Sequence, residues 1–390
     1  MPTPLQTRCK NMILGALTAD AAAVGLHWIY DQPHIRTLAP DTPEFRTPQA
    51  RDYEGVPAYF AHDGRSAGAQ SQYGEQTLVM LRALVAAGGQ FSAAGYAAAF
   101  RRHFGYGGSY VGYIDHATRD TLDNFRRFSD AAAACAQTIP FQREQRIRNA
   151  VLGKAVGLME TLQGADLEQA LEAAAREISS DDTVRDFAQT LLTALVALPP
   201  ATGAFDLQLP ATAKLPALIA ALTVKSPDGG ESFEAQVATA IRVTNDHPVA
   251  ADYGMVCARM MRAALIDGTI IAVTQAARTS ATPEAAALLK TAMEMQDQDT
   301  AQVARHFGMA CDLPFGVPTA LHNIVTAPTF TDAIRRNIYA GGDSCGRAII
   351  VGAVMGAIHG VDGVQGIPPD WIARLDAAPE LEIMMSRLFG

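Results

Sequence analysis

Three side chains that can do chemistry stand together near the C-terminus. The stretch YAGGDSCGRAIIVGAVMGAIHG, residues 339–360, places Asp343, Cys345 and Arg347 directly after two glycines. No acidic or basic residue follows until the histidine at its end, which predicts a buried helix. Two glycines let the backbone turn tightly in front of that helix, and the unpaired N–H groups of a first helical turn favour an anion. This pattern predicts a pocket at the helix start.

A second carboxylate, Glu75, opens the apolar segment EQTLVMLRALVAA, residues 75–87. If Glu75 and Asp343 face each other, both cannot ionise easily, so the pKa of one rises. A protonated acid beside a carboxylate is the arrangement that hydrolyses glycosidic bonds. In the alternative interpretation, Asp343 only caps its own helix, and Arg347 four residues later neutralises it.

His27 and Cys345 each allow two interpretations. His27 has a side chain that titrates near neutrality and is a candidate acid–base catalyst, or it packs beside Trp28. Cys345 is either a nucleophile whose pKa is lowered in the first turn of a helix, or a residue that fills space.

Further residues are expected to bind a ligand. Tyr73 either stacks on a base or packs beneath the loop before it, and Arg347 with its helix start is expected to hold a phosphate or a carboxylate. Asp115 and His116 open another helix, where Asp115 lines the cleft or serves as an N-cap. The candidate ligand-binding residues are Tyr73, Gln76, Asp115, His116, Gly341, Gly342, Cys345 and Arg347.

The elements that must position these residues are predicted to be helices throughout, so the expected class is all-α and the expected organisation is a single domain, 1–390. Helical periodicity covers 11–25, 75–87, 91–104, 115–127, 143–162, 166–178, 183–198, 215–222, 232–243, 248–266, 284–296, 302–307, 317–327, 331–339 and the opening stretch. Residues 31–72 contain five prolines and little periodicity. A connection of that length is either a lid over the site or a passive surface loop. Gly352 and Gly356 recur at a spacing of four, which predicts close approach of another helix.

The composition excludes several classes of function. The chain has 390 residues and a formal charge of −9, without a basic block, which argues against nucleic-acid binding. The longest apolar runs are too short to cross a bilayer, and no signal peptide is expected. Five scattered cysteines without CxxC spacing predict a reduced, cytoplasmic protein without structural zinc. The oligomeric state is left open.

Four segments, in order along the chain, resemble motifs of the ADP-ribosylglycohydrolase family. LGALTADAAAVGLHWIYD is similar to its Gly-Asp-Ala-Leu-Gly helix, with Asp20 at the aspartate. YGEQTLVMLRAL resembles its Thr-Asp-Asp-Thr helix, with Thr77 at the last threonine. GYIDHATRDTL resembles its Asp-Ile-Gly-x-x-Thr segment, with Asp115 at the aspartate. AGGDSCGRAIIVGAVMGAIHGVDGVQGIPPDWI resembles its C-terminal Gly-Gly-Asp signature. HWIYD, YGEQT and GGDSC are closer to the subgroup of jellyfish J-type crystallins and their bacterial relatives.

The resemblance implies an orthogonal helical bundle with a central cleft, in which two Mg²⁺ ions help to hydrolyse bonds between ADP-ribose and an acceptor. The positions of the family's metal ligands correspond to Gly74, Glu75 and Gln76 in one motif and to Asp343, Cys345 and Gly346 in the other. Two carboxylates remain of four, and sulfur is a poor ligand for Mg²⁺. The expected cofactor is therefore none, or a single Mg²⁺ held weakly by Glu75 and Asp343 with the Gln76 carbonyl. The family's catalytic glutamate falls on or near His27.

These observations lead to one main hypothesis. The chain is expected to be a hydrolase of ADP-ribosylglycohydrolase type that cleaves an N- or O-glycosidic bond of an ADP-ribosyl or related nucleoside-like ligand, with a degenerate dinuclear metal site. Its expected catalytic residues are Glu75, Asp343 and His27, and its expected partner is a small-molecule or ADP-ribosylated substrate. Two alternatives remain: a non-catalytic ADP-ribose-binding or crystallin-like structural protein, and a Mg²⁺ enzyme with unusual ligands.

Overall fold

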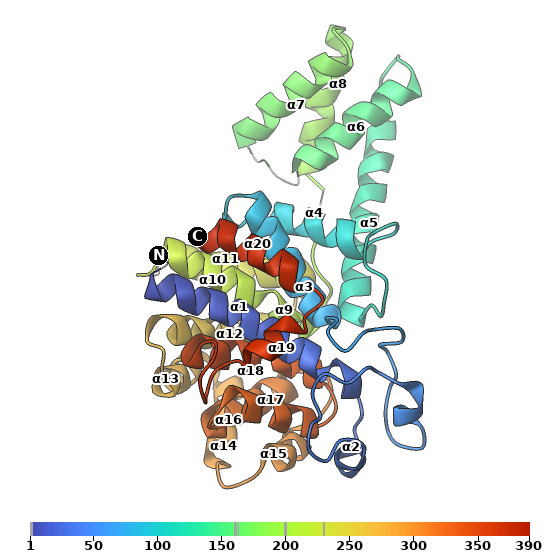
Figure 1. Cartoon of the computed structure of the whole chain (residues 1–390). Helices are drawn as coiled ribbons and strands as arrows, with labels where there is room; N and C mark the ends of the chain where they lie inside the picture. Colours follow the sequence, from blue (N-terminus) through green and yellow to red (C-terminus); the bar gives the residue numbers. More distant parts are fainter. Residues whose placement is uncertain (1–2, 160–161, 163, 199–200, 229–230) are drawn as a thin grey trace.

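The computed structural model describes residues 3–159, 162, 164–198, 201–228 and 231–390 (Figure 1). These residues form helices and loops without a β-sheet, and extended pairing is limited to isolated bridges such as Ile29 with Ala58. The all-α prediction is confirmed. None of the described helices combines the length and the apolarity that crossing a membrane requires.

The helices of the N-terminal half are α1 (Pro4–Ala23), η1 (Val24–Leu26), α2 (Gln32–Leu38), η2 (Ala50–Tyr53), α3 (Gln72–Ala86), α4 (Ala93–Phe104), α5 (His116–Thr138), α6 (Gln145–Met159), α7 (Gly164–Ile178) and α8 (Asp182–Val196). Those of the C-terminal half are α9 (Pro210–Ala213), α10 (Leu215–Lys225), α11 (Glu231–Thr244), α12 (Pro248–Ile266), α13 (Ile270–Ser280), α14 (Pro283–Glu294), α15 (Thr300–Phe307), α16 (Leu313–Thr326), α17 (Phe330–Tyr339), α18 (Ser344–His359), α19 (Pro369–Ala373) and α20 (Ala378–Phe389).

Helices α1 and α18 pack against each other at the centre of the main body (Figure 1). Every residue of α18 from Ser344 to Ala357 is buried, as its all-round apolar sequence predicts. A Cβ atom at Gly352 would lie 2.3 Å from the carbonyl oxygen of Gly15, and one at Gly356 would lie 2.5 Å from that of Asn11. The glycines therefore allow the two backbones to touch.

The described chain has a large core and a small one. The small core is formed by the second half of α5 with α6, α7 and α8, which extend away from the main body (Figure 1). Its buried residues include Val151, Leu171 and Leu191. The site residues described below belong to the main body, including the start of α5, and none of them lies in α6, α7 or α8.

The connection over residues 31–72 has more structure than its proline content predicts. It contains α2 and η2, and Ile35 and Phe45 are buried against the large core. Pro33 occupies the first turn of α2, where a missing N–H does no harm. Whether this loop acts as a lid stays a proposal.

The contact between α1 and α18 yields a stability prediction. We expect Gly352→Ala to lower the free energy of unfolding by about 1–3 kcal/mol, because the new methyl group overlaps the backbone of α1. Gly153→Ala is the matched control, since a Cβ atom there meets nothing within 4 Å. That change should raise the free energy of unfolding by about 0.5–1 kcal/mol through helix propensity. Urea denaturation measures both, and equal effects would contradict the close packing.

Candidate active site

The turn before α18 fixes the position of Asp343. Gly342 has φ +60°, and a Cβ atom there would lie 2.1 Å from the carbonyl oxygen of Met309. Its N–H donates to the Ile29 carbonyl at 2.8 Å, and its own carbonyl accepts from the Trp28 N–H at 2.8 Å. The turn is thus joined to the loop after α1, and only glycine fits this place.

The Asp343 carboxylate is a buried anion with several donors. Oδ1 accepts from the Gly346 N–H at 2.8 Å as the N-cap of α18, and it lies 3.2 Å from His27 Nε2. Oδ2 accepts from the Tyr73 hydroxyl at 2.5 Å, and the Cys311 thiol also donates to this carboxylate. Burial alone raises the pKa of a carboxyl group, but here the interactions with His27, Tyr73 and Cys311 outweigh it. They hold the pKa of Asp343 below its ordinary value.

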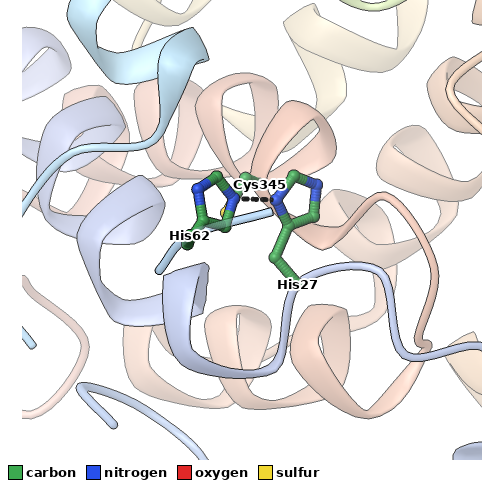
Figure 2. A group of neighbouring side chains, drawn as sticks. All are labelled: His27, His62 and Cys345. Atoms are coloured by element: carbon green, nitrogen blue, oxygen red, sulfur yellow. Dashed lines mark hydrogen bonds between the residues drawn. The ribbon is translucent and has the colours of Figure 1, made fainter. Parts of the chain in front are cut away.

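Two histidines continue this network (Figure 2). His27 Nδ1 lies 2.7 Å from Nε2 of His62, which comes from the 31–72 loop. Burial lowers the pKa of both imidazoles, so both are neutral. Because the ionised Asp343 can only accept, His27 carries its proton on Nε2 and His62 must donate from its own Nε2. His62 Nδ1 is then a buried acceptor without a partner among the described residues.

The backbone beside His27 is in an unusual conformation. Trp28 has φ +64°, a value rare for a residue with a bulky side chain. Its ring stacks on the His27 imidazole with centroids 4.2 Å apart, and the edges of Tyr59 and Tyr113 meet it at 5.7 and 5.1 Å. Such strained residues gather at functional sites. Tyr59 is 54% exposed, so these rings connect the surface with the buried histidine.

Cys345 lies close to the two histidines but is not an activated nucleophile. Burial raises the pKa of its thiol, which corrects the hypothesis that the helix start lowers it. The thiol donates weakly to the carbonyl of Asp20 at 3.7 Å. One ligand-type atom from each of His27, His62 and Cys345 lies within 4.8 Å of the others (Figure 2).

Asp20 joins α1 to the start of α3. Its carboxylate accepts from the Ser71 N–H at 2.8 Å and from the Ser71 hydroxyl at 2.5 Å. Burial raises the pKa of Asp20 to about 7, although the two hydrogen bonds from Ser71 act to lower it. A Cβ atom at Gly74 would lie 2.3 Å from the same carboxylate, so position 74 has no room for a metal-binding side chain.

The expected pairing of Glu75 with Asp343 needs correction. The Glu75 carboxylate lies 2.9 Å from His103 Nε2 and 3.8 Å from an Arg65 nitrogen. Asp343 is satisfied instead by His27 and Tyr73, and its pKa is lowered rather than raised. Each carboxylate thus has its own partners.

The ligand-binding candidates divide into buried and exposed residues. Asp115 is buried and caps α5 through the Thr118 N–H at 2.7 Å, whereas His116 lies exposed on the surface. Gln76 donates to the Thr118 hydroxyl at 3.2 Å. Tyr73 is buried and committed to Asp343, so it packs beneath the loop and does not offer its face to a base.

Asp115 also retains a free oxygen. Its Oδ2 has no partner among the described residues, and neither does Gln76 Oε1. Burial raises the pKa of Asp115 to about 6, and the charges of Asp206 and Asp343 act in the same direction.

Arg347 is held inside the protein by its own hydrogen bonds. It is fully buried, and its guanidinium donates to the Asn337 side chain at 3.0 Å and to the Gly341 carbonyl at 2.5 Å. Its Nη1 has no partner among the described residues, and the expected contact with a phosphate or carboxylate stays a prediction. Arg347 also braces the glycine turn and provides a positive charge near Asp343.

Sequence reasoning missed three participants, namely His62, Cys311 and His103. His62 stands in an irregular loop, and Cys311 and His103 belong to no motif that carries chemistry. Only the tertiary structure brings them to the site. A single sequence therefore gives no signal for them.

These features define an all-α protein with a buried carboxylate–imidazole site between α1, α3 and α18. The family model for ADP-ribosylglycohydrolase matches residues 1–180 and 158–390, so the chain belongs to the ADP-ribosylglycohydrolase family. It is 25% identical to crystallin J1A of Tripedalia cystophora over 378 residues, which cover 96% of this chain and 94% of that protein. It is 23% identical to crystallin J1B of the same organism over 405 residues, with 98% of each chain covered.

A solved structure supports the fold. The chain resembles one described as an ADP-ribosylglycohydrolase-related protein complex, with a TM-score of 0.54 and 14% identity over 99% of this chain and 98% of that one. This similarity shows a shared helical architecture.

The residues present do not fit the dinuclear magnesium site that the family implies. Mg²⁺ requires about six hard oxygen ligands in a near-octahedral arrangement. Positions 74 and 346 are glycines, position 345 offers sulfur, and Glu75 is paired with His103 and Arg65. The Asp343 oxygens are already occupied by donors from the protein.

The raised pKa of Asp20 gives a prediction about stability and pH. The folded chain keeps this proton up to about pH 7, whereas the unfolded chain releases it near the ordinary value of 3.8. Asp20 therefore makes the free energy of unfolding fall as pH rises from 4 to 7, by at most about 1.4 kcal/mol per unit. In Asp20→Asn this contribution is absent. Denaturation of both proteins at pH 4.5 to 7.5 measures this contribution. If the free energy of unfolding changes with pH in the same way in both proteins, the raised pKa of Asp20 is refuted.

Proposed function

We propose that the protein hydrolyses an N- or O-glycosidic bond of an ADP-ribosyl or related nucleoside-like group, without a pair of magnesium ions. The observation that carries this proposal is the buried pair of Asp343 and His27 in a chain of the ADP-ribosylglycohydrolase family. A carboxylate that fixes the tautomer of an imidazole leaves the other ring nitrogen free to accept a proton. Here that nitrogen is His27 Nδ1, which now faces His62.

The proposed reaction needs a base and an acid. Water that takes the place of His62 attacks the anomeric carbon and gives its proton to His27 Nδ1. The bond to the leaving group breaks, and the leaving group takes a proton from Asp115. A carboxyl group with a pKa of about 6 and a free oxygen suits that task. Asp115 thus replaces Glu75 as the proposed acid, and Asp343 positions His27.

Access to His27 requires the 31–72 loop to move, because His27 and His62 are both buried. The rings of Trp28, Tyr59 and Tyr113 contact one another, Trp28 stacks on His27, and Tyr59 is exposed at the surface. Flat aromatic faces of this kind suit a nucleobase or a sugar ring. We propose that the loop serves as the lid of this site.

A second function, a non-catalytic binding or structural role, is favoured by a different observation. The crystallins of Tripedalia cystophora are similar over almost their whole length, and His27, His62 and Asp343 are all buried. A protein that has lost catalysis needs no open path to its buried groups. In that case ADP-ribose raises the thermal stability without turnover, or has no effect.

Turnover by variants tests the proposed roles. With arginine- and serine-linked ADP-ribosyl peptides as substrates, we expect the wild-type protein to release ADP-ribose in the presence of a chelator. His27→Gln and Asp115→Asn should each lower kcat by roughly 10²–10⁴-fold, the usual contribution of a general acid or base. Chromatography of released ADP-ribose measures the rates.

The control is His116→Gln, because His116 adjoins Asp115 but is exposed. It should retain the wild-type rate. Absence of any release by the wild-type protein, together with thermal stabilisation by ADP-ribose, would refute hydrolysis and establish the binding role. Equal losses in all three variants would refute the assigned residues.

A further inference from the structure

We propose that His27, His62 and Cys345 bind one zinc-class divalent cation, which fastens the 31–72 loop to the protein core. The three side chains form the cluster shown in Figure 2, and one ligand-type atom from each lies within 4.8 Å of the others. All three are buried. This inference concerns metal binding alone and holds whether or not the proposed hydrolysis occurs.

The donor set selects the kind of metal. Two imidazole nitrogens and a thiolate suit zinc or cobalt, whereas magnesium prefers oxygen. The set also has the composition of an open zinc site, with three protein ligands and a fourth position for water. The same cysteine that makes the magnesium site impossible is therefore a good ligand for a softer ion.

The present distances require small adjustments. Ligands on one tetrahedral zinc lie roughly 3.5 Å apart, given Zn–N and Zn–S bonds of about 2.1 and 2.3 Å. His27 Nδ1 and His62 Nε2 are now 2.7 Å apart and joined by a hydrogen bond. These two nitrogens must separate by about 1 Å, and the metal takes the place of the proton between them. On binding, the Cys345 thiol releases its proton to solvent and gives up only a weak 3.7 Å contact with the Asp20 carbonyl. His62 then moves its proton to Nδ1, the atom that has no partner now.

The surroundings already contain the outer contacts that a metal-binding histidine uses. His27 Nε2 lies 3.2 Å from the Asp343 carboxylate, which leaves Nδ1 as the metal-binding atom. Carboxylate–histidine–metal arrangements orient the ring and strengthen it as a ligand. The Cys345 thiolate and the Asp343 carboxylate together carry two negative charges, as many as a divalent cation neutralises.

The three ligands come from separate parts of the fold. His27 follows η1, His62 lies in the 31–72 loop, and Cys345 is in the first turn of α18. An ion bound to all three therefore links the loop to the two central helices. It also occupies His27 Nδ1, so the metal-bound protein is closed.

Cobalt titration of the metal-free, full-length protein tests the site, with a non-thiol reductant present. We expect one Co²⁺ per chain and the near-ultraviolet charge-transfer absorption that reports a thiolate–cobalt bond. Cys345→Ser should lose this absorption. His62→Gln, a change in the loop, should also weaken binding, and Asp343→Asn should raise the Kd by about 10- to 100-fold. A large excess of Mg²⁺ should leave the absorption unchanged.

A matched cysteine variant completes the test. Cys135 lies in the second half of α5, in the small core region and away from the three proposed ligands. Cys135→Ser should keep the absorption and the stoichiometry. The proposal is overturned if the wild-type protein shows no thiolate–cobalt absorption. It is equally overturned if the absorption survives in Cys345→Ser, is lost in Cys135→Ser, or disappears when Mg²⁺ is added.

Discussion

Burial of the Asp343 carboxylate as an anion is the constraint on which the site depends. A charge can remain in the interior only when hydrogen bonds replace its water. The Gly346 N–H, His27, Tyr73 and Cys311 supply them, and the Arg347 charge is nearby. The glycine turn, the positive φ of Trp28 and the tautomers of both histidines all follow from bringing these donors to one carboxylate.

The same constraint explains how this chain differs from the magnesium enzymes implied by its family. An Asp343 that is saturated by protein donors has no oxygen left for a hard cation. Gly74 makes room for Asp20, and Glu75 turns to His103 and Arg65. The groups at the centre of the site are the imidazoles of His27 and His62 and the thiol of Cys345. These groups can transfer protons or bind metals softer than magnesium.

The sequence predicted the helices of the core well, because α3 and α18 have strong apolar patterns and clear glycine or N-cap signals. It omitted α2, where proline starts the helix, and α13, whose two opening isoleucines favour a strand. It also omitted α20 and the short helices α9 and α19. Asp343 and His27 could be identified from their motifs. His62 and Cys311 could not, because long-range packing brings them to the site. The pairing of Glu75 was wrong because its partners come from a loop and from α4.

The most direct test is the protonation of the histidine rings. Nitrogen-15 NMR of labelled protein distinguishes protonated from bare imidazole nitrogens, and His27→Gln and His62→Gln assign the signals. At neutral pH we expect His27 and His62 to be neutral, each with its proton on Nε2, and we expect this single tautomer to be lost in Asp343→Asn. A neutral His27 with its proton on Nδ1 in the wild-type protein, or a tautomer that is unchanged in Asp343→Asn, would show that Asp343 does not organise the site.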